Sequence, residues 1–203
     1  MTPSPTLREV SGLSARLPLL SESALIMIDC QNTYRSGVMT LDGADAAIAA
    51  AAALLERART AAVPVIHIVN DGGEDSLYDI RAHSGAIVDE LAPVDGEPVV
   101  VKQVPNAFHG TDLETTLRTA GFNPGSDLLL AGFMTHMCVT FTAQGAFNLG
   151  YRPTVIADTT ATRTLATPAG SPLPAAALKQ SALTTITDLF GLVVPNASFI
   201  HTV

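Results

Sequence analysis

The sequence predicts one α/β domain of three layers, in which helices cover both faces of a doubly wound, parallel, six-stranded sheet. Short apolar runs alternate along the chain with helix-forming segments, which is the pattern of βαβ units. The runs are almost continuously apolar, as expected for strands that are buried on both faces. The length of 203 residues also fits a single hydrophobic core.

Six short apolar runs are expected to form the strands, since each has the length of a buried strand. In chain order they cover residues 24–28, 64–69, 99–101, 127–131, 153–157 and 192–194. The second and third are rich in β-branched residues, which favour strands.

The segments between these runs are expected to be helical. Residues 44–62 are dense in alanine, a strong helix former, and residues 112–120 are stopped by Gly121. A third helix runs through Ala146 to Leu149, and a fourth carries Leu178, Ala182, Ile186 and Leu189 on one face. Residues 167–174 contain three prolines and a glycine, which predicts a loop. We expect residues 1–23 to be a lead-in and residues 24–203 to be the domain.

The composition excludes several classes of protein. Eleven Lys and Arg are scattered against nineteen Asp and Glu, so no basic stripe is available for nucleic acid. The longest apolar run, Ala46 to Leu55, is too short for a membrane span, and no secretory signal is visible. Two cysteines are too few for a disulfide framework, and we therefore expect the reducing cytoplasm. Only 15% of the residues are charged, which predicts either a large core or a homodimer or higher homo-oligomer.

Three chemically active side chains come directly after, or at the end of, different predicted strands. Asp29 follows the first strand, Lys102 ends the third, and Cys138 lies in the first helical turn after the fourth. Open parallel sheets bind ligands beyond the carboxyl ends of their strands, so the fold predicts that the three meet there. A helix start and a nearby lysine favour a thiolate, whereas Asp29 opposes it, so the sequence leaves the resting state of the thiol open.

The residues around these three positions resemble the isochorismatase-like cysteine hydrolase superfamily, which includes nicotinamidases and N-carbamoylsarcosine amidohydrolases. The resemblance covers residues 24 to about 195 and rests on three motifs in the same order: residues 28–32, Lys102 with residues 106–108, and residues 132–139. It implies a catalytic triad of Asp29, Lys102 and Cys138. It also implies a cis peptide at Phe133–Met134 and an oxyanion hole made by the amides of Met134 and Cys138.

Two departures narrow the activity that the resemblance implies. True isochorismatases lack the nucleophilic cysteine, so Cys138 favours hydrolysis of a C–N bond in a small amide or imide through a thioester. Nicotinamidases carry a set of metal-binding histidines, whereas residues 70–75 offer no such set, so neither nicotinamide nor a metal is expected. No glycine-rich nucleotide-binding loop is present, and no cofactor is expected.

Four further side chains are predicted to contact the substrate: Gln31, Tyr34, Phe108 and His136. His109 is as good a candidate for a substrate contact as His136. Arg163 is a candidate for contact with an acidic substrate or with a neighbouring subunit. Cys30 should point to the opposite face of the sheet from Asp29, which favours a structural role.

Two alternatives stay open at this point. One keeps the fold but uses a non-covalent or metal-assisted reaction. The other is a member of the fold that has lost hydrolysis and serves as a small-molecule-binding or thiol-redox module.

Overall fold

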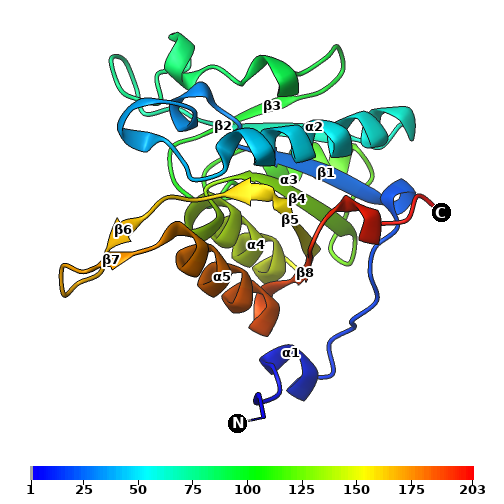
Figure 1. Cartoon of the computed structure of the whole chain (residues 1–203). Helices are drawn as coiled ribbons and strands as arrows, with labels where there is room; N and C mark the ends of the chain where they lie inside the picture. The colour runs from blue at the N-terminus through cyan, green and yellow to red at the C-terminus, as the bar shows by residue number, and fades with distance from the viewer. Residues whose placement is uncertain (1) are drawn as a thin grey trace.

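The six apolar runs predicted from the sequence form the six strands of one parallel sheet in the computed structural model, which describes residues 2–203. The strands are β1 (Ser23–Ile28), β2 (Val65–Asn70), β3 (Val99–Lys102), β4 (Asp127–Phe133), β5 (Arg152–Ala161) and β8 (Leu192–Val194). Their order across the sheet is β3-β2-β1-β4-β5-β8 (Figure 1). The chain therefore starts at the centre and winds outward to both edges, which confirms the predicted doubly wound sheet.

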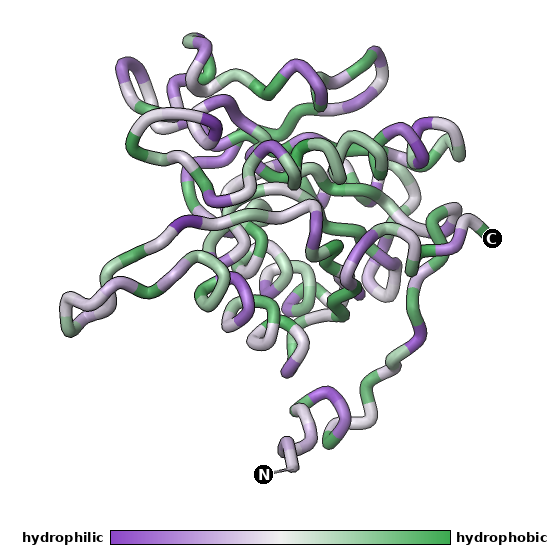
Figure 2. The backbone as a smooth tube through the Cα atoms, in the orientation of Figure 1, coloured by the Kyte–Doolittle hydropathy of each residue, from purple (hydrophilic) through white to green (hydrophobic). Residues whose placement is uncertain are grey.

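Helices cover both faces of this sheet. Helix α2 (Ala44–Thr60) lies on one face, and α3 (Leu113–Thr119), α4 (Thr140–Asn148) and α5 (Ala175–Thr185) lie on the other (Figure 1). Successive residues of β1 point to opposite faces, so Leu25 packs in the core under α2 and Ile26 packs in the core on the other face. Burial on both sides explains why the central strands are almost wholly hydrophobic (Figure 2).

Strand β5 is longer than predicted. The apolar run ends at Ala157, but the strand continues to Ala161, where Thr160 and Ala161 pair with Gly132 and Phe133 of β4. A shift of register between Leu130 and Gly132 makes this second stretch of pairing possible. The extension is polar and takes its strand conformation from a partner distant in sequence, so the local pattern did not predict it.

The predicted loop at residues 167–174 is part of a small hairpin. Its strands β6 (Leu165–Ala166) and β7 (Pro172–Leu173) pair in antiparallel fashion, and the hairpin projects from the body of the molecule (Figure 1). Pro168 and Gly170 lie at its tip and Pro172 lies in its second strand, whereas Pro174 follows the hairpin and directly precedes α5.

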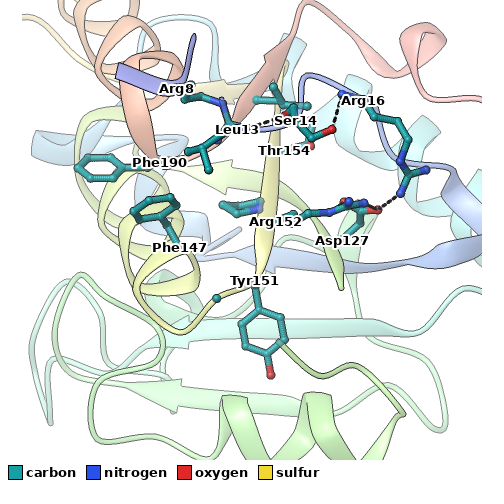
Figure 3. Close-up of a pocket in the computed structure, with 13 residues that line it drawn as sticks. Arg8, Leu13, Ser14, Arg16, Asp127, Phe147, Tyr151, Arg152, Thr154 and Phe190 are labelled. Atoms are coloured by element: carbon teal, nitrogen blue, oxygen red, sulfur yellow. Dashed lines mark hydrogen bonds and ion pairs between the residues drawn. The ribbon is translucent and has the colours of Figure 1, made fainter. Parts of the chain in front are cut away.

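The lead-in lies against the amino edge of the sheet. Its short helix α1 (Leu7–Val10) is held by the Leu7 amide, which donates to Asp188 Oδ1 at 2.9 Å, and by Arg8, which donates to the Leu189 carbonyl at 3.2 Å. A pocket of about 250 Å³ separates the lead-in from the body (Figure 3). Asp127 and Arg152, the first residues of β4 and β5, line it, so this pocket lies at the opposite end of the sheet from the strand ends that carry the predicted site.

Among the residues described, no helix combines the length and the apolar character needed to cross a membrane.

Candidate active site

Asp29 occupies an unusual backbone conformation at the end of β1. Its φ is +48°, in the left-handed region that residues with a Cβ rarely adopt, and its amide donates to the Ile68 carbonyl of β2 at 2.9 Å. Its side chain is completely buried. Strained conformations of this kind persist where the surrounding structure fixes them, and they concentrate at functional sites.

Lys102 is the residue that joins the predicted triad. It is the last residue of β3, its side chain is completely buried, and its Nζ lies 2.7 Å from Oδ2 of Asp29. The same Nζ lies 3.3 Å from Sγ of Cys138 and donates a hydrogen bond to it. The structure therefore brings the three side chains together at the carboxyl edge of the sheet, around one ammonium group.

Cys138 lies in a π-helical turn, Thr135–Val139, that leads from β4 into α4. The turn follows a cis peptide between Phe133 and Met134, as the resemblance implies. The Met134 carbonyl accepts hydrogen bonds from the amides of Met137 and Val139, at 3.0 and 3.2 Å. Within residues 2–203 the Met134 amide itself donates to no backbone or side-chain acceptor. Its assignment to an oxyanion hole stays a prediction.

Burial and neighbouring charge set the protonation of the thiol. Burial first, and then the negative charge of Asp29, raise the pKa of Cys138 to about 12, although Lys102 opposes both effects. Burial also raises the pKa of Asp29, against the opposing charge of Lys102. The sequence left the resting state open, and the structure favours the neutral thiol at neutral pH, beside a carboxylate able to accept its proton.

Asn70, at the end of β2, is a site residue that the sequence reasoning did not select. Its Oδ1 accepts a hydrogen bond from Lys102 Nζ at 3.1 Å, so it helps to orient the ammonium group. Gln31 in turn holds this strand end. Its Nε2 donates to the Asn70 and Gly85 carbonyls at 2.9 and 2.7 Å, and its Oε1 accepts from the Asn70 amide at 3.1 Å. The buried amide of Gln31 therefore already bonds to the backbone. Its contact with a substrate stays a prediction.

Two tyrosines lie beside the triad. Tyr34 is buried, and its ring packs edge-on against Tyr78 and Phe133, with ring centroids 5.8 and 5.6 Å apart. Burial and the charges of Asp29 and Cys138 raise the pKa values of Tyr34 and Tyr78. Tyr34 was predicted as a substrate contact. Tyr78 was not, because it comes from the irregular segment between β2 and β3, where no periodic pattern marks its neighbours.

The other predicted contacts differ in their surroundings. The Phe108 ring stacks on Tyr151 with centroids 5.9 Å apart, in the core on the α4 face. His136 is half-buried, and its Nδ1 lies 2.5 Å from Thr162 Oγ1. His109 is exposed. Their roles as substrate contacts stay predictions.

Cys30 and Cys138 pack on opposite faces of the sheet. Cys30 lies in the core under α2, whereas Cys138 lies in the core on the other face. Burial and the charge of Asp29 raise the pKa of Cys30, so this thiol is inert, as its predicted structural role requires. Residues 2–203 contain no group of three or more His, Cys, Asp or Glu side chains arranged to hold a metal ion.

Comparison with known proteins places this geometry in a family. The model of the isochorismatase domain matches residues 23–194. A crystal structure of an isochorismatase from Pseudomonas putida superposes with a TM-score of 0.91 and 38% identity, over 97% of this chain and 99% of that one. The secreted isochorismatase effector Isc1 of Verticillium dahliae is 30% identical over 93% of this chain and 96% of its own. The ureidoacrylate amidohydrolase RutB of Stutzerimonas stutzeri is 33% identical over 69% of this chain and 70% of its own. The chain therefore belongs to the isochorismatase family of hydrolases.

Proposed function

We propose that this protein is a cysteine hydrolase that cleaves a C–N bond in a small amide or imide through a thioester on Cys138. The observation that carries the proposal is the buried ammonium group of Lys102, which lies 2.7 Å from the Asp29 carboxylate and 3.3 Å from the Cys138 sulfur. One relative, RutB, is named as an amidohydrolase, which supports the proposal that this kind of bond is hydrolysed.

The reaction begins with proton transfer from the Cys138 thiol to Asp29 as the sulfur attacks the carbonyl carbon. The amides of Met134 and Cys138 stabilise the negative oxygen of the tetrahedral intermediate. Asp29 then returns the proton to the departing nitrogen, which leaves as ammonia or an amine, and a thioester remains. A water molecule attacks the thioester with Asp29 as its base, which releases the acid and restores the thiol.

Lys102 acts in this scheme through its own positive charge, which stabilises negative charge on its two neighbours. When the proton moves from sulfur to carboxylate, negative charge moves from Asp29 to Cys138, and the ammonium group contacts both atoms. The ammonium group therefore stabilises the negative charge both before and after the proton transfer. This attraction offsets the cost of holding a negative charge in a site of low dielectric constant. Asn70 orients the ammonium group through its hydrogen bond at 3.1 Å.

Ammonia release from a panel of small amides, measured for the wild type, Cys138→Ala and Cys30→Ala, tests the proposal. We expect turnover by the wild type and by Cys30→Ala, because Cys30 lies on the other face of the sheet, and none by Cys138→Ala. Turnover by Cys138→Ala would contradict the thioester mechanism. Loss of that turnover on chelation would point instead to the metal-assisted alternative.

The expected cytoplasmic location stays a prediction, and one relative is by name a secreted effector.

A further inference from the structure

The pocket of about 250 Å³ between the lead-in and the amino edge of the sheet has walls that are mostly apolar. Phe147 of α4 and Phe190, which ends the turn after α5, lie side by side in its wall, with ring centroids 6.1 Å apart (Figure 3). Leu13 of the lead-in and Leu192 of β8 also line it. An apolar cavity of about 150 Å³ holds a benzene molecule. This pocket is therefore large enough for an aromatic ring that carries a small polar group.

The lead-in covers this pocket without filling it. Two arginines tie it to the body: Arg8 donates to the Leu189 carbonyl at 3.2 Å, and Arg16 donates to Asp127 Oδ2 at 3.4 Å. Leu13, in contrast, stays 38% exposed although it lines the pocket. The walls of an unfilled apolar cavity lack the van der Waals contacts of a packed core, and a ligand that occupies the cavity restores them.

The charged side chains that line the pocket leave one positive charge open. Arg152 and Arg16 both pair with the Asp127 carboxylate, and Arg16 also lies 4.0 Å from Glu22. Arg8 lines the pocket as well, but within residues 2–203 no carboxylate oxygen lies within 4.0 Å of its guanidinium. This local excess of positive charge contrasts with the net charge of −8 of the whole chain. The pocket therefore favours an anion over a neutral molecule of the same size.

The guanidinium of Arg8 has donors left for such an anion. Its Nη1 donates to the Leu189 carbonyl, and its Nη2 donates to the Ser14 carbonyl at 2.8 Å. These bonds use two of the five N–H groups of a guanidinium. The side chain is half-buried, and burial lowers the pKa of Arg8, so water solvates its charge only in part. A carboxylate accepts two N–H groups of one guanidinium at once and supplies the single negative charge that Arg8 lacks.

We propose that this pocket binds a small carboxylate with an aromatic body. The carboxylate bonds to Arg8, and the ring packs between the lead-in and the side chains of Phe147 and Phe190. Because Arg8 and Leu13 belong to the lead-in and the two phenylalanines belong to the body, a bound ligand joins the two parts. The pocket lies at the opposite end of the sheet from Cys138, so this site is separate from the active site and independent of the proposed function.

Trypsin cleavage of the full chain after Arg16 tests the proposal, because a ligand that joins the lead-in to the body slows local opening there. Intact-protein mass spectrometry follows the cleavage rate at increasing concentrations of three probes. Benzoate carries both a ring and a carboxylate, benzyl alcohol lacks the charge, and acetate lacks the ring. We expect half-maximal protection at a benzoate concentration at least tenfold lower than that of either other probe. An unstructured arginine peptide in the same reaction checks that the probes leave trypsin itself active.

Two variants remove the site in different ways. Arg8→Gln removes the charge, so benzoate should protect no better than benzyl alcohol. Leu13→Trp fills the pocket but keeps Arg8, so benzoate should no longer change the cleavage rate. Arg118→Gln is the matched control, since it removes the same charge from an exposed pair with Glu114 on α3 and should keep the preference for benzoate. Each rate is compared with that of the same variant without a probe, which cancels any change in how firmly the lead-in is held, and thermal unfolding checks that each variant is folded.

Several outcomes would overturn the proposal. They are the absence of protection by benzoate, protection by benzyl alcohol or acetate at the same concentration as benzoate, and a benzoate preference that survives in Arg8→Gln or in Leu13→Trp. Protection that Cys138→Ala abolishes would place benzoate in the active site and would overturn the proposal as well. Ammonia release tests the proposed function separately, because the triad and this pocket share no residue.

Discussion

Lys102 and Asp29 form an ion pair whose side chains are both completely shielded from water. Removing one member of a buried pair leaves the other charge without compensation, which typically costs about 3–5 kcal/mol. We therefore expect Lys102→Gln to abolish activity and to lower the free energy of unfolding by about that amount at pH 8. Chemical denaturation at several pH values measures the change.

The pH dependence of this variant has a definite sign. Burial raises the pKa of Asp29, and without Lys102 only a hydrogen bond with Cys138, the smallest of the opposing influences, counters that shift. From the ordinary carboxyl pKa of about 4 upward, the unfolded chain loses this proton before the folded one does, so unfolding releases a proton. The free energy of unfolding of Lys102→Gln should consequently fall as the pH rises from 4 to 8. The double variant Asp29→Asn/Lys102→Gln should lose that dependence. A Lys102→Gln variant as stable at pH 8 as at pH 5 would contradict the argument.

The triad residues could be predicted from the sequence because each stands at a break in an apolar run. Asp29 and Lys102 end such runs directly, and strand ends of a parallel sheet converge. Tyr78 could not be predicted in this way, because it comes from an irregular segment between β2 and β3 that no periodic pattern marks.

At the scale of elements, the core strands were predictable and their polar continuations were not. The pattern of β1 to β4 reflects burial on both faces, which the apolar residues record directly. The extension of β5 over Asp158–Ala161 depends on pairing with the end of β4, and the hairpin formed by β6 and β7 occupies a stretch that its prolines mark as a loop. In both segments the strand conformation depends on pairing with another segment of the chain, and the local residue preferences do not indicate it.

Gly132 shows how closely two of these strands must approach beside the site. It pairs with Ile28 at the end of β1, its φ is +118°, and an added Cβ would collide with the Ile28 backbone. We expect Gly132→Ala to force β1 and β4 apart next to Asp29, to cost at least about 3 kcal/mol of stability, and to abolish activity.

Gly110→Ala is the control for this prediction, because Gly110 also has a positive φ, +68°, but open space around it. It should cost about 1 kcal/mol, the price of the left-handed conformation alone. Denaturant titration of the two variants compares them. Equal losses of stability would show that backbone conformation, rather than the approach of the two strands, makes Gly132 necessary.

At the scale of the whole molecule, an apolar patch remains exposed close to the nucleophile. Val104 and Phe141 are 37% and 40% exposed, and with Met137 they line a pocket of about 370 Å³. Met137 precedes Cys138, so the patch adjoins the turn that carries the thiol. Together with the low proportion of charged residues, 15%, this patch supports the expected homo-oligomer.

We propose that a second copy of the chain covers this patch. Light scattering should then give a mass at least twice the 21.1 kDa of one chain, and Phe141→Asp should shift the mass toward the monomer because it buries a charge in the contact. Val38→Asp makes the same chemical change at a side chain that is 77% exposed and distant in sequence, and it should leave the mass unchanged. A wild-type mass of one chain would contradict the oligomer. An oligomer that Phe141→Asp leaves intact would move the contact to another surface, and the patch beside Cys138 would then be free to receive substrate from solution.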